Sequence, residues 1–166
     1  MQTRRKAAML LAGAGAAVLG ARWLSGDARA EKTKSFEIAK SADEWKKLLT
    51  APQYYVLREH GTERPGTSAL NQEKRKGVYS CAGCDLPLFS SATKYESGTG
   101  WPSFYDVLPE AVGTQVDRSL FMTRTEVHCR RCGGHLGHVF DDGPRPTGLR
   151  YCMNGVALKF KPDRAA

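Results

Sequence analysis

Two identical C-x-x-C pairs constrain the fold of this chain more than any other feature of its sequence. Cys81 and Cys84 form "CAGC", and Cys129 and Cys132 form "CRRCG", with 44 residues between the pairs. Two such turns can each present two thiolates to one tetrahedral zinc ion. Four thiolates leave no open coordination position, so we expect one structural Zn2+ held by these four cysteines.

The first thirty residues have the organisation of a secretory signal. A basic start, "MQTRRK", precedes the apolar run "AAMLLAGAGAAVLGA", and the segment ends in an Ala-x-Ala step. We expect a cleaved signal peptide over residues 1–30, and the paired Arg4 and Arg5 favour the twin-arginine route to the bacterial periplasm. The alternatives are an ordinary export route and a membrane anchor, although the apolar run is shorter than the roughly 20 residues that span a bilayer.

The basic character of the chain lies largely in this signal. The formal net charge is +8, and residues 1–30 hold five basic residues and one acidic residue, so cleavage lowers the charge to +4. The remaining excess comes without an arginine-rich helix or a run of basic and aromatic residues. We therefore expect no nucleic-acid partner and, after cleavage, no membrane partner.

Export also raises the alternative that the paired cysteines form disulfides, because an exported chain meets an oxidising compartment. Disulfides within C-x-x-C turns are strained and usually redox-active, and two of them would be unusual in a structural scaffold. The pattern favours zinc, and folded export would allow the metal to be loaded before the thiols meet an oxidant.

Helix signals follow a flexible lead-in that we expect at residues 31–40. Ser41 and Glu44 form an S-x-x-E capping box, which predicts the start of a first helix. Pro52 opens a second short helix, which Gly61 ends.

Short β-prone runs separated by turn residues occupy the chain from Gly77 onward. They include "GVYS", "AVGTQV", "LFMTRTEV" and "GVALKF". We predict one mainly β, antiparallel domain over residues 41–166, with short helices at its N-terminal edge.

The fifth cysteine, Cys152 in "GLRYCMN", has no partner left in the chain. If "RYCMN" is a strand, its alternation places Arg150, Cys152 and Asn154 on one face. A guanidinium close to a thiol favours the thiolate, which is the nucleophilic form. The hypothesis is a reactive Cys152, and the alternative is an inert buried cysteine.

A Gly- and Pro-rich segment, "GGHLGHVFDDGPRPTG", leads directly into this strand and is predicted to be a loop. It contains His135, His138 and Asp142. Titratable residues beside a nucleophile can supply a general acid and hydrogen-bond donors. The alternative, a metal bound by the two histidines, ranks lower because the cysteines already complete one metal site.

The motifs "SGTGWPSF", "HLGHVFDDGP" and "GLRYCMN", with the paired C-x-x-C turns, resemble the B-type methionine-R-sulfoxide reductases from roughly Ser41 to Phe160. The resemblance implies two antiparallel β-sheets with short N-terminal helices, and reduction of peptide-bound methionine-R-sulfoxide to methionine. It implies that Cys152 is the nucleophile and becomes a sulfenic acid, and that Trp101 receives the methyl group of the substrate.

The resemblance also implies roles for the polar residues around the thiol. His138 is the stronger candidate for proton donation, and His135 lies near the sulfoxide. Asp142, Arg150 and Asn154 are expected to position and activate the thiol or to bind substrate. A thiolate that attacks a sulfoxide needs an acid beside it, because the departing oxygen must be protonated.

Thr99 departs from a common pattern of this family, in which a resolving cysteine occupies the same position. With four cysteines assigned to zinc, no thiol remains in the chain to form a disulfide with Cys152. We expect the Cys152 sulfenic acid to persist until a thioredoxin-like protein or a small thiol attacks it. The expected partners are therefore oxidised proteins carrying methionine-R-sulfoxide and this external reductant, and we expect a monomer.

Two other functions are compatible with parts of the sequence. The first is a non-enzymatic, zinc-stabilised binding module of similar fold, in which Cys152 is inert. The second is a general thiol oxidoreductase that uses one C-x-x-C pair, which would lack zinc and need no tryptophan pocket. Cys152 together with Arg150, His138 and Trp101 favours the reductase, because a binding module does not need that set.

Overall fold

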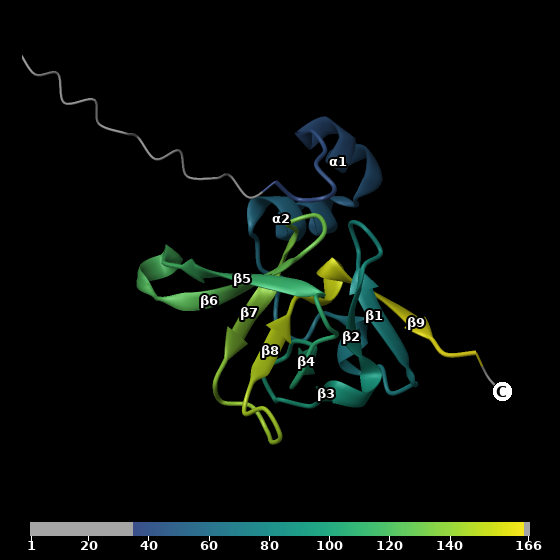
Figure 1. The fold of residues 1–166 in the computed structure, drawn as a ribbon, viewed down its shortest axis with the longest axis vertical. Helices are drawn as coiled ribbons and strands as arrows, with labels where there is room; N and C mark the ends of the chain where they lie inside the picture. Colours follow the sequence, from purple (N-terminus) through teal and green to yellow (C-terminus); the bar gives the residue numbers. More distant parts are fainter. Residues whose placement is uncertain (1–34, 165–166) are drawn as a thin grey trace, which may run out of the picture. The chain divides into compact units, whose positions relative to one another are not determined.

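A computed structural model of the chain describes residues 35–164 (Figure 1). The predicted signal peptide, residues 1–30, lies outside the described residues, so its cleavage and route stay predictions. Across residues 35–164 the longest helix has nine residues, and no helix there has the length and apolar character needed to cross a membrane.

Two short helices open the described chain where the sequence predicts them. α1 covers Ala42–Leu48, and its N-terminus carries the complete capping box of Ser41 and Glu44. α2 covers Ala51–Glu59, with its proline in the first turn. It ends at His60, whose backbone is left-handed with φ of 55°. This conformation turns the chain away from the helix and directs it toward the sheets.

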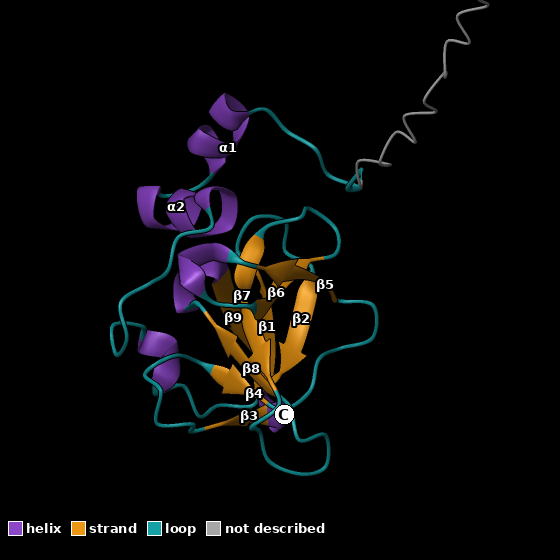
Figure 2. Cartoon of the chain, turned by 90° about the vertical axis from the view of Figure 1, so that its left-hand side faces the viewer, coloured by secondary structure: helices purple, strands orange, loops and turns teal. Residues whose placement is uncertain are grey.

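Two antiparallel β-sheets make up most of the remaining structure and confirm the predicted fold class (Figures 1 and 2). The smaller sheet has the order β2-β1-β9, and the larger has the order β3-β4-β8-β7-β6-β5. The strands are β1 (Gly77–Cys81), β2 (Pro87–Ser90), β3 (Lys94–Tyr95), β4 (Ser103–Phe104), β5 (Val112–Asp117), β6 (Arg124–Cys129), β7 (His135–Phe140), β8 (Arg150–Met153) and β9 (Leu158–Pro162). Short 3-10 helices are η1 (Ala69–Asn71), η2 (Ser91–Thr93), η3 (Ser119–Phe121) and η4 (Gly155–Ala157).

Aromatic side chains from both sheets meet in the core. Phe104 of the larger sheet stacks on Phe89 of the smaller sheet with ring centroids 4.3 Å apart, and it meets Tyr79 edge-on at 4.9 Å. All three rings are fully buried. Because apolar burial is the main favourable contribution to folding, these contacts fix the two sheets against each other.

The strand register of the larger sheet aligns a row of polar residues. Tyr95 of β3 pairs with Ser103 of β4, Ser103 pairs with Cys152 of β8, Cys152 pairs with His138 of β7, and His138 pairs with Glu126 of β6. Residues paired directly across antiparallel strands point to the same face. The register therefore brings Cys152 together with residues far from it in sequence.

The predicted loop across "GGHLGHVFDDGPRPTG" is wrong in its first half, because His135–Phe140 form β7 between two other strands. Gly137 sits in this strand for a packing reason, since a Cβ there would lie 2.1 Å from the carbonyl oxygen of Cys152. The predicted strand "LFMTRTEV" also begins too early. Its first residues belong to η3, and β6 starts only at Arg124.

Candidate active site

The four paired cysteines converge in one cluster. The Sγ atoms of Cys81 and Cys132 are 3.7 Å apart, and those of Cys84 and Cys129 are 3.5 Å apart. All four sulfurs lie within 4.8 Å of one another, and none forms a disulfide. Sulfurs bound tetrahedrally at about 2.3 Å from a zinc ion would be roughly 3.8 Å apart. The cluster therefore has the size and the ligands to hold one metal ion.

Side chains around the cluster tie it to the helices. Arg58 of α2 donates from Nη1 to the carbonyl oxygen of Cys132 at 3.0 Å and from Nη2 to its Sγ at 3.6 Å. The same guanidinium lies 4.4 Å from the ring centroid of Trp45 in α1. From the described end of the predicted lead-in, Ile38 N–H donates to the carbonyl oxygen of Arg131 at 3.0 Å. Residues before the first strand thus stabilise the second C-x-x-C turn.

Cys152 faces a separate small cavity of about 110 Å3. Its Sγ lies 3.7 Å from the hydroxyl oxygen of Thr99. That hydroxyl is 2.8 Å from the hydroxyl of Ser97, which in turn is 2.7 Å from the hydroxyl of Ser103. A chain of three hydroxyls therefore ends at the sulfur. The cavity is lined by Thr62, Trp101, Arg124, Gly137, His138, Phe140, Cys152 and Asn154.

Trp101 forms a fixed wall of this cavity. Its indole Nε1–H donates to the carbonyl oxygen of Glu63 at 2.9 Å. Glu63 N–H donates to the side-chain oxygen of Asn154 at 2.8 Å, and the Glu63 carboxylate accepts from the N–H of Gly155 at 2.6 Å. The segment after α2 thereby joins the tryptophan to the end of β8.

Asn154 lies beyond the strand, because β8 ends at Met153 and Asn154 caps η4. Its side-chain amide is buried and donates to the carbonyl oxygen of Leu136 at 3.0 Å. It also lines the Cys152 cavity. The alternation argument thus brings Asn154 to the predicted place, although its two side-chain hydrogen bonds hold backbone segments together.

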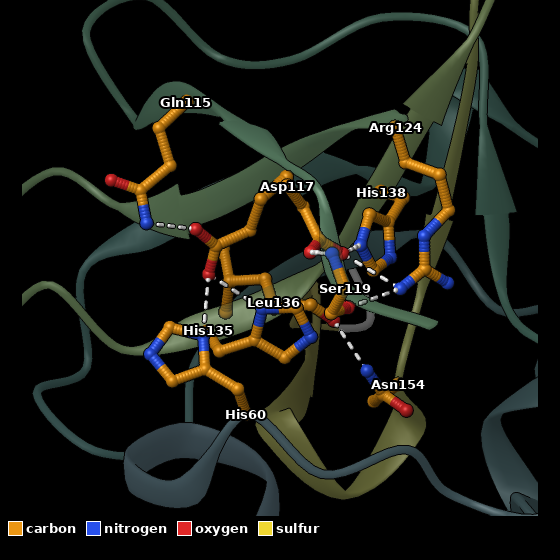
Figure 3. Close-up of polar contacts among 10 residues, drawn as sticks. His60, Gln115, Asp117, Ser119, Arg124, His135, Leu136, His138 and Asn154 are labelled. Carbon is orange, nitrogen blue, oxygen red and sulfur yellow. Dashed lines mark hydrogen bonds and ion pairs between the residues drawn. The ribbon is translucent and has the colours of Figure 1, made fainter. Parts of the chain in front are cut away.

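His138, which lines the cavity, belongs to a charged group with Asp117 and Arg124 (Figure 3). Its Nε2 lies 2.8 Å from Oδ2 of Asp117, which also accepts from Nη2 of Arg124 at 2.7 Å. Hydrogen bonds from Ser119 and His138 hold the pKa of Asp117 well below its usual range. An ionised carboxylate only accepts, so the proton on this contact belongs to His138 Nε2.

Burial lowers the pKa of His138, against the opposing effect of its hydrogen bond to Asp117. The neighbouring Arg124 contributes a cation to the cavity lining. Its Nε is buried and has no hydrogen-bond partner among the described residues.

His135 lies next to His138, with ring centroids 5.4 Å apart, but it does not line the Cys152 cavity. Residues three apart in a regular strand point to opposite faces. A β-bulge interrupts β7 here: Val127 pairs with Gly137 and the next residue, His128, pairs with His135, so Leu136 has no partner in β6. The bulge changes the direction of the His135 side chain relative to a regular strand. His135 Nδ1 lies 2.7 Å from Oε1 of Glu126 and faces a larger adjoining cavity of about 650 Å3.

Arg150 and Asp142 form a two-pronged ion pair outside the cavity lining. Arg150 donates from Nε and Nη2 to the two oxygens of Asp142, both at 2.7 Å. The pairing raises the pKa of Arg150 and lowers that of Asp142. The guanidinium lies 4.4 Å from the ring centroid of Phe140, which does line the cavity. The ion pair therefore does not contact the cavity itself, but Arg150 packs on Phe140, which forms part of the cavity wall.

Residues 49–162 match the SelR domain. The chain belongs to the B-type methionine sulfoxide reductase family. A Methanosarcina barkeri protein named peptide methionine sulfoxide reductase MsrB is 61% identical over 127 residues, which cover 76% of this chain and 89% of the relative. The Leptospira interrogans protein of the same name is 56% identical over 130 residues, covering 78% and 99%. An Arabidopsis thaliana protein named peptide methionine sulfoxide reductase B1, chloroplastic, is 57% identical over 121 residues, covering 72% and 60%.

Several residues of this reductase site were not found by sequence reasoning. Thr62 and Arg124 line the Cys152 cavity, and Asp117 and Glu126 hold the two histidines. The available signal was the alternation in "RTEV", where two charged residues occupy the face opposite Thr125 and Val127. Charged residues on one face of a strand point to a polar site on that face.

Glu126 should make the stability of this reductase domain depend on pH. Burial alone would raise the pKa of Glu126, but hydrogen bonds from His135 and Gln115 outweigh it and hold the pKa at about 2. The folded pKa is below the unfolded value, so the stabilisation is complete above about pH 4.5 and is lost as pH falls toward 2. Urea unfolding of wild type and Glu126→Gln should show a stability gap that narrows by about 2 kcal/mol between pH 6 and pH 3. A gap independent of pH would contradict this ionised pairing.

Proposed function

We propose that this chain reduces peptide-bound methionine-R-sulfoxide to methionine, with Cys152 as the nucleophile. The observation that supports it best is the opening of a free thiol onto a small cavity between the ring of Trp101 and the imidazole of His138. A nucleophile, an apolar wall and a titratable donor are the groups that a thiol-based sulfoxide reduction requires. A non-enzymatic binding module would not need these three groups around one cavity.

The proposed step begins with attack of the Cys152 thiolate on the sulfoxide sulfur. The S–O bond of the substrate breaks, its oxygen takes a proton and becomes the hydroxyl of a Cys152 sulfenic acid, and the substrate leaves as the thioether. The cysteine sulfur loses two electrons and the substrate sulfur gains two. His138 is the proposed proton donor in its protonated form: it lines the same cavity, Asp117 binds Nε2 and fixes the ring, and the Nδ1 proton passes to the oxygen.

Selection for the R form follows from the two unlike walls of the cavity. The ring of Trp101 suits the methyl group, while Arg124 and His138 suit the sulfoxide oxygen. In the S form the two groups exchange places, so a polar oxygen meets the indole ring and the donors lose their partner. Each buried polar group left without a partner costs about 1–3 kcal/mol, and the oxygen and its donors lose their partners together, so the summed cost exceeds the roughly 2.7 kcal/mol that corresponds to 100-fold discrimination.

The sulfenic acid is proposed to be recycled from outside the chain. Thr99 lies beside Cys152, and its hydroxyl cannot form a disulfide. An external thiol attacks the sulfenic acid and releases water, and a second thiol then resolves the mixed disulfide and restores Cys152. A thioredoxin-like protein or a small thiol would fill this role.

The four-cysteine cluster is proposed to hold one structural Zn2+. Its sulfur separations fit tetrahedral coordination, and its four thiolates would fill every position. The zinc would supply folding stability and no step of the reaction. Export to the periplasm through the twin-arginine route, followed by action as a monomer on oxidised proteins, remains part of the same proposal.

One turnover without reductant tests the proposed intermediate. Wild-type protein given one equivalent of a methionine-R-sulfoxide peptide should acquire a dimedone adduct on Cys152, read by peptide mass spectrometry. Thr99→Cys should instead lose the adduct and form a disulfide between positions 99 and 152, because Oγ1 of Thr99 is only 3.7 Å from Sγ of Cys152. Thr99→Ser is the matched control and should retain the adduct. An internal disulfide in the wild type would refute external recycling.

A further inference from the structure

A second group of side chains that could hold a metal ion lies outside the cysteine cluster, on the larger cavity. It consists of His60, Glu126 and His135, whose ligand atoms lie within 4.8 Å of one another. His60 Nδ1 is 3.1 Å and His135 Nδ1 is 2.7 Å from the same carboxylate oxygen, Oε1 of Glu126 (Figure 3). Two imidazole nitrogens from different elements therefore converge on one carboxylate oxygen.

The carboxylate of Glu126 is held in place for this contact. Its other oxygen, Oε2, accepts from the side-chain amide of Gln115, so Oε1 is left to the two histidines. The side chain of Glu126 is only 3% exposed, yet its pKa of about 2 keeps it ionised. A buried, oriented carboxylate between two imidazoles is a strong cation ligand.

His60 gives the group an open side. It occupies the left-handed position after α2, and its side chain is 58% exposed. Glu126 and His135 are buried, but all three residues line the cavity of about 650 Å3. Solvent therefore reaches the place where the three ligand atoms meet, and water can occupy the remaining coordination positions.

We propose that His60, Glu126 and His135 form a second site, which binds one divalent transition-metal ion through two imidazole nitrogens and one carboxylate oxygen. Ligand atoms about 2.1 Å from a metal ion lie roughly 2.9–3.4 Å apart; the separation of 3.1 Å between His60 Nδ1 and Oε1 falls within this range, and the 2.7 Å between His135 Nδ1 and Oε1 lies just below it. Imidazole ligands suit Zn2+, Co2+, Ni2+ or Cu2+ and disfavour Mg2+ and Ca2+. Unlike the four-sulfur cluster, this site is open, so its ion would exchange readily.

The position of this site couples it to the reductase chemistry. The ring of His135 is 5.4 Å from the ring of His138, which lines the Cys152 cavity. A divalent cation on His135 would place a positive charge beside the cavity that receives the sulfoxide. This consequence rests on the proposed function, whereas metal binding itself does not.

Metal stoichiometry tests the site directly. The full chain is equilibrated with Co2+ by dialysis, and bound metal is counted by elemental mass spectrometry for wild type and His60→Ala. The wild type should bind one equivalent more than the variant, whatever the cysteine cluster holds. The extra ion should give the weak visible bands of nitrogen and oxygen ligands without a thiolate charge-transfer band.

Glu59→Gln is the matched control, because it removes a charge from the same cavity without removing a ligand. It should retain the extra equivalent, and the affinity of His60→Ala for that ion should fall at least about tenfold. Equal metal content in wild type and His60→Ala would overturn the proposal. The bound ion should also change the rate of sulfoxide reduction in wild type but not in His60→Ala; an unchanged rate would contradict the coupling, whereas the metal count alone decides the site.

Discussion

Cys152→Ser should lower kcat/KM for a methionine-R-sulfoxide peptide by at least about 1000-fold, because the hydroxyl cannot replace the thiolate as the atom that accepts the oxygen. The remaining four cysteines cannot substitute for it, since their sulfurs are gathered in the separate cluster. Initial rates with dithiothreitol as reductant measure the effect.

The control for this variant is the fold itself. Cysteine and serine have nearly the same size, and Cys152 lies on the surface of a cavity. Thermal unfolding and metal content should therefore remain close to those of the wild type. Activity within a few-fold of wild type, in a folded Cys152→Ser protein, would mean that another group carries out the reaction.

Removal of the proposed zinc from the four-cysteine cluster should unfold the domain. Structural zinc sites contribute on the order of 10–16 kcal/mol of apparent binding free energy, which is comparable with the whole stability of a domain. The cluster joins the end of β1 to the end of β6, and Arg58 links it to α2. Cys81→Ser and Cys129→Ser should each lower the melting temperature by about 15 °C or more, as should a strong chelator.

Cys152→Ser is a useful comparison here, because it removes a thiol without touching the cluster. It should respond to chelator as the wild type does, whereas the cluster variants should show little further effect. The melting temperature is measured by circular dichroism, and the metal released during the same temperature scan is quantified. A wild-type domain that kept its melting temperature after complete metal removal would show that the four cysteines do not need an ion.

Local signals in the sequence predicted the local parts of the structure well. The capping box at Ser41 is formed as expected, and the C-x-x-C pairs meet in a cluster that can hold one metal ion. Alternation along "RYCMN" placed Arg150 and Asn154 beside Cys152; Asn154 does line the Cys152 cavity, whereas Arg150 lies outside its lining. These features depend on residues close together in the chain or on a ligand chemistry with few alternatives.

Long-range contacts were much harder to predict. The side chain of Asp117 in β5 contacts that of His138 in β7, and 20 residues separate the two in sequence. The contact depends on how β5 and β7 each align with β6 between them, and the sequence of a single strand does not reveal that alignment. The glycines around His135 indicate a loop, yet position 137 is a glycine because the backbone of β8 approaches too closely for any side chain. A close backbone contact and a flexible turn favour the same residue, so the sequence alone did not separate them.

The most direct test of the proposed function is a stereochemical assay. The protein is incubated with dithiothreitol and the separated R and S sulfoxides of an N- and C-terminally blocked methionine, and the thioether is measured by chromatography. In the proposed mechanism only the R form places its methyl group on Trp101 and its oxygen toward His138, so its initial rate should exceed that of the S form by at least about 100-fold. Equal rates for the two isomers, or reduction of the S form alone, would contradict the account.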